Sequence, residues 1–251
     1  MAYGALYATP GVIESTEAAR RFEAAAVEYS VLYAIPGVIE STEAARRFNV
    51  LSSYFPRTVS IAIWINEIGP TGIASESDAE KSLEGIRQLG ANLNDVRGLD
   101  AVILGCFADP GLDLFRSAAK VPVIGPGEAS LEQGLRRGSR LGIITTVPQV
   151  VPVIRAMARA ARPDLNVEAI PISPIGLPGS GIRESPEEAF SRAMAAIETL
   201  RARYEVDVIC LGCMGFCWSG LASRLAQAVP QIRLVDPLQA SFDRFRELVA
   251  Y

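Results

Sequence analysis

Four cysteines are the residues of this chain whose types and spacing could carry chemistry. Three of them, Cys210, Cys213 and Cys217, fall within the stretch VICLGCMGFCW, and the fourth, Cys106, lies far upstream in VILGCFADPGL. Such thiols can bind a metal, form disulfides, pack as small apolar side chains or transfer protons. The sequence around each cysteine decides between these roles.

The chain contains no histidine among its 251 residues. Ser-His-Asp and Cys-His nucleophile pairs are therefore excluded, and so are zinc sites that use imidazole. Any proton transfer must use cysteine, a carboxyl group, lysine, tyrosine or water.

Cys210 lies inside the apolar run VDVICLG, which is typical of a buried strand. Because strand side chains alternate between faces, Cys210 shares a face with Val206 and Val208 and is expected to pack in the core. A tetrahedral metal site would need Cys106 as its fourth ligand and the three clustered cysteines on one side. The alternation disfavours that arrangement, and Cys217 receives no predicted role.

Cys106 and Cys213 each follow a glycine at the expected carboxyl end of a strand and precede a turn into a helix. Unpaired amides and the helix dipole at such a turn stabilise an anion, so we expect a lowered thiol pKa at both positions. The same amides could hold a substrate carboxylate or an enolate oxygen. These amides belong to Phe107, Ala108, Met214 and Gly215.

Two thiols that face each other suit the inversion of a carbon acid. One removes a proton from one face of the carbon while the other delivers a proton to the opposite face. The roles exchange for the reverse reaction, and neither a metal nor a cofactor is required. The paired Gly-Cys corners therefore predict proton transfer rather than metal binding.

The elements that must position these thiols follow from the hydrophobic pattern. Apolar β-branched runs alternate with longer helical segments, as in parallel sheets covered by helices on both faces. Eight such units could close a barrel or form two open four-stranded sheets. Strands are predicted at 29–35, 58–65, 99–105, 121–125, 140–146, 166–172, 206–212 and 232–236. Helices are predicted at 40–54, 77–95, 110–119, 127–137, 147–161, 185–204, 219–229 and 238–250.

A likeness between two segments favours two domains over a barrel. LDAVILGCFADPG and VDVICLGCMGFCW each begin a strand with an aspartate, Asp100 or Asp207, and end it in Leu-Gly-Cys. In open α/β sheets, ligands bind beyond the carboxyl ends of the strands. We therefore predict an α/β fold of two pseudo-symmetric open parallel-sheet domains with both thiols at the cleft between them.

The start of the chain carries a near-perfect duplication. LYATPGVIESTEAARRF at 6–22 recurs at 32–48 and differs only at Thr9 versus Ile35. Two copies are too few for a repeat architecture. Only the second copy leads into the next strand, so we expect residues 1–28 to form an extension, either an added helix or a partly ordered arm. Neither ARRF tetrad is followed by a long apolar region, which argues against a twin-arginine export signal.

The composition argues against several kinds of partner. Hydrophobic residues make up 49% of the chain and charged residues 21%, which indicates a folded globular protein. The formal net charge of −4 argues against nucleic acid as the main partner, and no apolar run has the length of a membrane span. A cytoplasmic location with reduced thiols is the expectation.

Several motifs together resemble the Asp/Glu/hydantoin racemase superfamily. They are CFADPGL, PVIGPGEAS, GSRLGIITT, LGCMGF and a final VDP, and the middle stretch is most similar to hydantoin racemases. The likeness runs from about Tyr29 to the end of the chain. It implies two pseudo-symmetric α/β domains, no cofactor, and one catalytic cysteine from each domain, here Cys106 and Cys213.

The resemblance also implies further substrate-binding residues. Thr145 and Thr146 match strand-end hydroxyls that help to anchor the substrate. Many relatives carry an Asn-Pro-Asn-type turn that contacts substrate after the first strand, where this chain has Ile35-Pro36-Gly37 and lacks the polar contacts. The implied domains are 29–125 plus 237–251 for the first and 126–236 for the second.

The leading hypothesis is a cofactor-independent racemase acting on a small molecule with a carbonyl or carboxylate. A 5-substituted hydantoin is the first substrate to consider, and an acidic amino acid is the second. A decarboxylase of the arylmalonate type, which the same superfamily contains, would need only one thiol. A non-catalytic small-molecule binding protein would need neither. We also expect a homo-oligomer.

Three weaker motifs receive mainly structural interpretations. GPGEAS follows a strand as a dinucleotide-binding loop would, but no acidic residue ends a strand about 20 residues later. The glycine-rich stretch 176–182 is expected to be a loop over the cleft, with a role as a lid left open. Asp109 is expected to cap the helix that follows Cys106.

Overall fold

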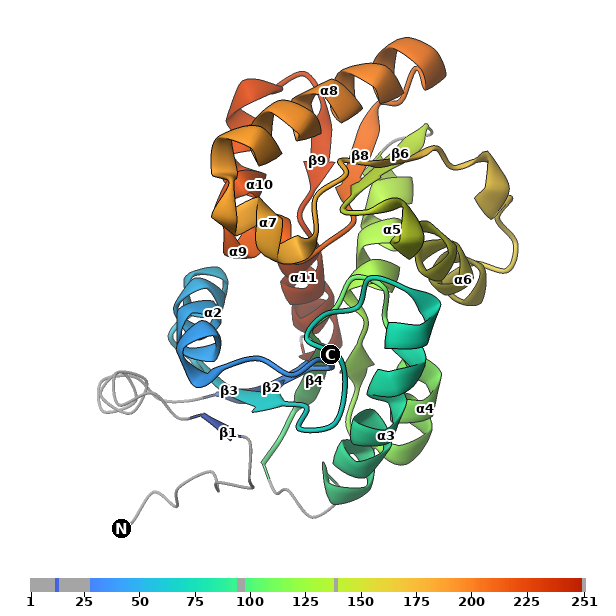
Figure 1. Ribbon diagram of the computed structural model, residues 1–251. Helices are drawn as coiled ribbons and strands as arrows, with labels where there is room; N and C mark the ends of the chain where they lie inside the picture. The colour runs from blue at the N-terminus through green and yellow to red at the C-terminus, as the bar shows by residue number, and fades with distance from the viewer. Residues whose placement is uncertain (1–11, 14–27, 94–97, 138–139, 250–251) are drawn as a thin grey trace.

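The computed structural model describes residues 12–13, 28–93, 98–137 and 140–249, and it arranges them around two β-sheets (Figure 1). The strands of the first sheet are β1 (Val12–Ile13), β2 (Tyr29–Ile35), β3 (Val59–Ile65), β4 (Ala101–Leu104) and β5 (Val123–Ile124). Those of the second sheet are β6 (Leu141–Thr145), β7 (Ile172–Pro174), β8 (Val208–Leu211) and β9 (Arg233–Val235).

The strand order is β1-β3-β2-β4-β5 in the first sheet and β7-β6-β8-β9 in the second. Four strands of each sheet are parallel to their neighbours, and β1 pairs antiparallel with β3 at an edge. The fold is therefore the predicted α/β class with two open parallel sheets, and the barrel alternative is excluded.

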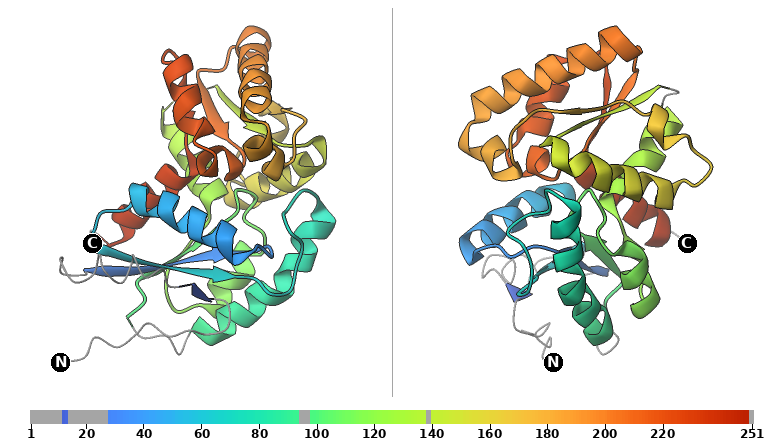
Figure 2. Two further views of the ribbon diagram at one scale, coloured as in Figure 1. Left: turned by 60° about the vertical axis from the view of Figure 1, so that its left-hand side comes forward. Right: turned by 45° about the vertical axis from the view of Figure 1, so that its right-hand side comes forward.

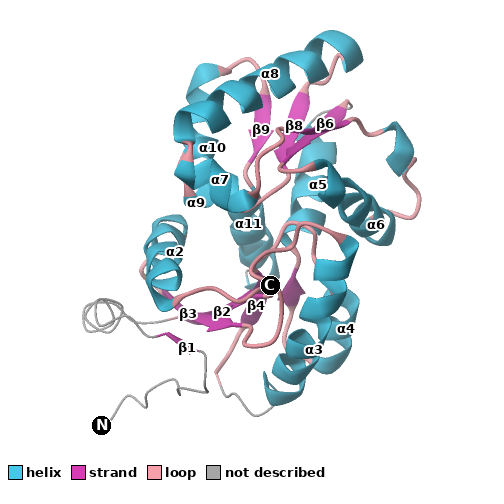
Figure 3. Cartoon of the chain, viewed as in Figure 1, coloured by secondary structure: helices cyan, strands magenta, loops and turns pink. Residues whose placement is uncertain are grey.

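Helices cover both faces of each sheet (Figure 3). Those around the first sheet are α2 (Ser41–Tyr54), α3 (Glu76–Leu93), α4 (Leu112–Ala118) and α11 (Pro237–Val249). The others are α5 (Pro126–Arg137), α6 (Val151–Ala161), α7 (Gly179–Glu184), α8 (Pro186–Tyr204), α9 (Gly215–Trp218) and α10 (Leu221–Ala228), with 3-10 turns at η1 (Pro148–Val150) and η2 (Val167–Ala169). None of the described helices is long and apolar enough to cross a membrane.

Alternate residues of β2 belong to two apolar clusters. Val31, Tyr33 and Ile35 share one cluster with side chains of α2 and α11. Leu32 and Ala34 share another with side chains of α3 and α4. Because neighbouring strand residues point to opposite faces, each cluster fills one side of the first sheet, and this burial on both faces explains why the strand is apolar throughout.

Cys210 lies in the core of the second sheet, as predicted. Its side chain is fully buried, and its Sγ lies 3.3 Å from the backbone oxygen of Ser130, to which it donates a hydrogen bond. Val208 belongs to the same cluster, whereas Val206 belongs to the cluster on the opposite face. The expectation for Val206 was wrong because β8 begins only at Val208, so the strand alternation does not extend back to Val206.

Two helices, α5 with 12 residues and α11 with 13, join the two sheets. The helices α5 and α11 pack on each other, α5 also contacts β8 and β9, and α11 also contacts α2 and β5. The two further views in Figure 2 show the sheets as separate layers, one above the other, with these helices between them. The division into domains at 29–125 plus 237–251 and at 126–236 stays a prediction.

The short helix α9 precedes the helix predicted at 219–229, and two further segments differ from the predicted elements. Residues 166–172, expected as a strand, form η2 and then enter β7, an edge strand where Pro174 removes no needed hydrogen bond. The stretch 176–182, expected as a loop, contains the start of α7. Ile182 is fully buried there, and this burial outweighs the low helix propensity of glycine.

The two copies of the duplicated segment differ in structure where both are described. Val12 and Ile13 of the first copy form β1. The same dipeptide in the second copy, Val38–Ile39, lies in a loop, where the Val38 amide donates to the Pro70 carbonyl at 2.8 Å. The rest of the first copy, where an added helix or an arm was expected, lies outside the described residues.

Candidate active site

The two Gly-Cys corners have the same backbone construction. The Gly105 amide, after β4, donates to the Ala34 carbonyl of β2 at 2.6 Å. The Gly212 amide, after β8, donates to the Ile144 carbonyl of β6 at 2.7 Å. Each cysteine-bearing strand is thus fastened at its carboxyl end to the neighbouring parallel strand, and the two corners are structurally equivalent.

Both corners require glycine because other atoms occupy the place of a Cβ. A Cβ at Gly105 would lie 2.5 Å from Cε1 of Tyr33, and one at Gly212 would lie 2.7 Å from Cγ2 of Ile143. The Ile144 carbonyl oxygen would also lie 2.8 Å from the added atom at Gly212. The close approach expected from the two glycines is therefore present at both corners.

Cys106 is half-buried at the turn that leads from β4 to α4. Burial raises the pKa of its thiol to about 12, while a hydrogen bond from the Ala108 backbone acts in the lowering direction. Phe107 and Ala108, which follow it, are both buried.

Cys213 is half-buried at the turn that leads from β8 to α9. The Gly215 amide donates to its Sγ at 3.3 Å. On the side of α7, a Cβ at Gly179 would lie 3.7 Å from the same sulfur. Burial raises the pKa of the Cys213 thiol, against the lowering effects of the Gly215 amide and of Arg47.

The expectation of lowered thiol pKa values was therefore wrong for both corners. The amides act on the two thiols in the expected direction, but the loss of water around each sulfur outweighs them. Each corner opens a helix of at most seven residues, so little helix dipole is available to oppose desolvation.

The structure brings the two corners to one site. Phe107 and Ala108, next to Cys106, share a continuous apolar cluster with Met214 and Trp218, which follow Cys213. The Cys213 thiol is also among the groups that raise the pKa of Cys106, so the two sulfurs lie within electrostatic reach of each other.

The remaining predicted substrate-binding residues lie at the carboxyl ends of the neighbouring strands. Thr145 is fully buried, and its Oγ1 donates to the Gly212 carbonyl at 2.9 Å. Thr146 is buried beside it, and Ile35 ends β2 next to the Cys106 corner. Thr145 therefore braces the Cys213 corner directly. Their contacts with a substrate stay predictions.

Asp109 caps a different helix from the one expected. Its Oδ1 accepts from the Gly127 amide at 3.1 Å and its Oδ2 from the Glu128 amide at 2.8 Å, at the start of α5 rather than of α4. Burial raises the pKa of this carboxyl to about 8, with the two amides acting against the rise. Asp109 also has a positive φ of 47°, a conformation that Asp adopts more readily than most residues.

Cys217 has a defined partner that the sequence did not reveal. Its Sγ donates to Oδ1 of Asp236 at 3.3 Å, and Tyr54 donates to Oδ2 of the same carboxylate at 2.7 Å. The amides of Leu238 and Gln239 also donate to Asp236, which caps α11. The aspartate of the final VDP motif therefore links α9, α2 and α11.

Two residues of the site were missed by the sequence analysis. Tyr33 is fully buried, and its hydroxyl is the buried side-chain group without a hydrogen-bond partner among the described residues. Arg47, in the second ARRF tetrad, lies with its guanidinium carbon 5.6 Å from the Trp218 ring centroid. The helix predicted after the first strand includes Arg47, but no neighbouring sequence feature indicates that this helix contacts α9.

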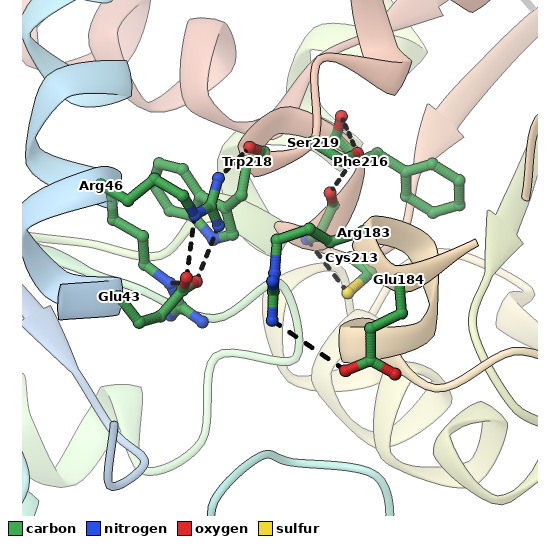
Figure 4. A network of polar contacts seen from close by, with 10 residues as sticks. Glu43, Arg46, Arg183, Glu184, Cys213, Phe216, Trp218 and Ser219 are labelled. Carbon is green, nitrogen blue, oxygen red and sulfur yellow. Dashed lines mark hydrogen bonds and ion pairs between the residues drawn. The ribbon is translucent and has the colours of Figure 1, made fainter. Parts of the chain in front are cut away.

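Helix α2 contacts α9, and Figure 1 shows α2 below α9 on the left-hand side of the view. Arg46 of α2 donates to the backbone carbonyl of Trp218 and pairs with Glu43 (Figure 4). These contacts tie the first sheet to the segment that follows Cys213.

Two open parallel sheets, each ending a strand in a glycine and a half-buried cysteine, define a two-domain α/β protein with a shared site. The model of the Asp/Glu/hydantoin racemase family matches residues 39–244, and the chain belongs to this family. A hydantoin racemase from Rhizobium meliloti is 32% identical over 179 residues, which cover 68% of this chain and 69% of that protein.

Solved structures show the same fold. An allantoin racemase from Klebsiella pneumoniae has a TM-score of 0.75 at 22% identity, covering 89% of this chain and 88% of that one. A mutant of arylmalonate decarboxylase has a TM-score of 0.60 at 16% identity, covering 88% of this chain and 92% of that one. The fold is therefore shared by proteins named for two different reactions.

Proposed function

We propose that the chain is a cofactor-independent racemase that moves protons between Cys106 and Cys213, with a 5-substituted hydantoin as the first-choice substrate. The observation that supports this most is the pair of half-buried Gly-Cys corners, built alike and within electrostatic reach of each other. A decarboxylase needs one proton donor only, so a second equivalent thiol favours racemisation.

The proposed reaction balances without a co-reactant. The thiolate of one cysteine takes the proton from C5 of the ring, and the electron pair of that bond passes into the neighbouring carbonyl as an enolate. The other cysteine, still a thiol, gives its proton to the opposite face of C5. The carbon is inverted, and the two sulfurs have exchanged their roles.

Backbone groups next to the two thiols are proposed to stabilise the thiolates that these steps require. The Gly215 amide already donates to Cys213 and would stabilise its thiolate, as the Ala108 backbone would for Cys106. A raised pKa makes each thiolate a stronger base once it forms, which suits a weakly acidic carbon. Substrate contacts are proposed for Ile35, Phe107, Ala108, Thr145, Thr146, Met214 and Gly215.

One enantiomer of 5-benzylhydantoin in deuterium oxide provides the test. We expect optical rotation to decay to zero while one deuterium enters at C5, as followed by polarimetry and mass spectrometry. The double variant Cys106→Ser/Cys213→Ser is expected to fall to the uncatalysed rate. Full activity of that variant would refute the two-thiol mechanism.

A short substrate panel separates the alternatives. Carbon dioxide release from an arylmalonate without racemisation of any hydantoin would identify a decarboxylase. Racemisation of aspartate or glutamate alone would move the substrate class to acidic amino acids. Tight binding of a hydantoin with neither exchange nor loss of rotation would identify a binding protein.

A further inference from the structure

A cluster of one acid and two cations lies on α2 at the shared site. Glu43 accepts hydrogen bonds from Nε of Arg46 at 2.8 Å, from Nη2 of Arg46 at 2.7 Å and from Nε of Arg47 at 2.8 Å. The hydrogen bond from Arg46 lowers the pKa of Glu43 to about 2, so the carboxylate stays ionised. One negative charge thus faces two positive charges, and the cluster keeps a net positive charge.

The two arginines differ in what remains available for a ligand. Arg46 uses Nε, Nη1 and Nη2 to hold Glu43 and the Trp218 carbonyl. Arg47 uses only Nε, and within the described part of the chain its Nη1 and Nη2 have no hydrogen-bond partner. Its side chain is 19% exposed, so a small molecule can reach it.

The guanidinium of Arg47 is held in a fixed orientation beside the thiols. It lies over the ring of Trp218, five residues after Cys213 in the chain. A contact between a guanidinium and an aromatic ring restricts the orientation of the guanidinium plane. Its charge acts to lower the pKa of Cys213 and of Cys106 against the effect of burial, so both sulfurs lie within its electrostatic range.

We propose that Arg47 binds a carboxylate on the substrate, so that the preferred substrates are hydantoins whose 5-substituent carries a negative charge. A guanidinium whose Nη1 and Nη2 have no partner among the described residues matches the two oxygens of a carboxylate, and partial burial strengthens the pair. The hydantoin ring itself carries no carboxylate, so the charge must come from the substituent. This inference rests on the proposed racemase activity.

Arg183 is a second cation in the same region, on α7 (Figure 4). Its side chain is 52% exposed, and its only described ion pair, with Glu184, spans 4.0 Å. It is not among the groups that shift the pKa of either catalytic thiol. Arg183 therefore serves as the matched control for Arg47.

The test compares 5-(carboxymethyl)hydantoin with its uncharged amide, 5-(carbamoylmethyl)hydantoin, which has nearly the same size. We expect the wild type to show a kcat/KM for the acid about 10- to 100-fold above that for the amide, the range of one charge-assisted hydrogen-bond pair. Arg47→Gln should bring this ratio close to one, mainly through KM, because the carboxylate lies away from the reacting carbon. Using a ratio removes any effect of Arg47 on the thiols themselves.

Arg47→Lys should keep part of the preference, and Arg183→Gln should keep all of it. A wild-type ratio of one or less overturns the inference, and so does a preference that survives Arg47→Gln. If Arg47→Gln does not fold, the Arg47→Lys ratio decides: a reduced ratio supports Arg47 and an unchanged one overturns it. Absence of racemisation with both hydantoins and with 5-benzylhydantoin would instead refute the proposed function.

Discussion

The Cys106 and Cys213 corners share one backbone but differ in the side chains that surround it. Because Ala34 and Ile144 accept the equivalent amide hydrogen bonds, Tyr33 of the first corner corresponds to Ile143 of the second. By the same register, Ile35 corresponds to Thr145. Equal backbone geometry therefore coexists with different chemistry on the two sides of the site.

The difference makes the second corner the better braced of the two. Thr145 donates to the Gly212 carbonyl, and Ile35 has no group that could do the same for Gly105. Tyr33 instead places beside the first corner a hydroxyl that has no partner among the described residues, at a cost of about 1–3 kcal/mol for an unsatisfied buried group. A pseudo-symmetric pair of thiols thus sits in two unequal environments.

The largest expected effect comes from removing one of the two thiols at a time. Cys106→Ser and Cys213→Ser should each lower racemisation by about 10²- to 10⁴-fold, the contribution of a positioned acid or base. Each variant keeps one base, so each should still exchange the C5 proton of one enantiomer with deuterium, and the two variants should act on opposite enantiomers. Polarimetry and deuterium incorporation on each pure enantiomer measure this. Exchange of the same enantiomer by both variants would contradict opposed thiols.

The next effect concerns the glycine of each corner. Gly105→Ala and Gly212→Ala should each destabilise the protein by about 1–3 kcal/mol, because the added methyl overlaps neighbouring atoms. At each corner the added methyl meets a backbone carbonyl oxygen as well as a side chain, that of Ala34 at 3.0 Å in Gly105→Ala and that of Ile144 at 2.8 Å in Gly212→Ala. Gly72→Ala is the control, because a Cβ there meets nothing within 4 Å. Chemical denaturation measures all three, and equal stability of the three variants would remove the steric explanation.

A third expectation concerns stability in alkali. Burial raises the pKa of Cys106 to about 12, whereas the pKa of a thiol in the unfolded chain is about 8.5. Above that lower value the unfolded chain has lost a proton that the native protein keeps, so the free energy of unfolding should fall as pH rises, by at most about 1.4 kcal/mol per pH unit for this thiol. Urea denaturation between pH 8 and 10 measures the slope. Cys106→Ser should make it shallower, and an unchanged slope would rule out a buried protonated thiol.

The smallest expected effect tests the unpaired hydroxyl. Tyr33→Phe should raise the free energy of unfolding by about 1 kcal/mol, because it removes a buried polar group that no described residue pairs with. Tyr29→Phe is the control, since the Tyr29 hydroxyl lies 3.5 Å from the Val249 carbonyl at a partly buried position. Thermal unfolding compares the two, and a loss of stability in Tyr33→Phe would mean that the hydroxyl has a partner after all.

The sequence predicted the features that repeat along the chain. Alternating apolar strands and helices indicated two parallel sheets, and the paired Leu-Gly-Cys motifs indicated the two corners. Cys210 was predicted to pack because strand alternation is a local property. Each of these predictions depends on residues that are neighbours in sequence or on a pattern that occurs twice.

Features that depend on distant contacts were not predictable in the same way. The direction of the thiol pKa shifts depends on how much water the folded protein removes, and the target of Asp109 depends on where α5 begins relative to the Cys106 turn. The position of Arg47 beside Trp218 depends on the contact between α2 and α9, which are about 170 residues apart in the chain. Helix α7 was also not predicted, because it is stabilised by the burial of Ile182 in the folded protein.

The position of Trp218 gives the protein an internal optical reporter. Its ring centroid lies 5.7 Å from that of Tyr33 on β2, in a T-shaped arrangement, and 5.6 Å from the guanidinium carbon of Arg47 on α2. The chain has only two tryptophans, and Trp64 is buried within the first sheet away from this junction. Fluorescence of Trp218 will therefore record any separation of the two sheets, independently of turnover.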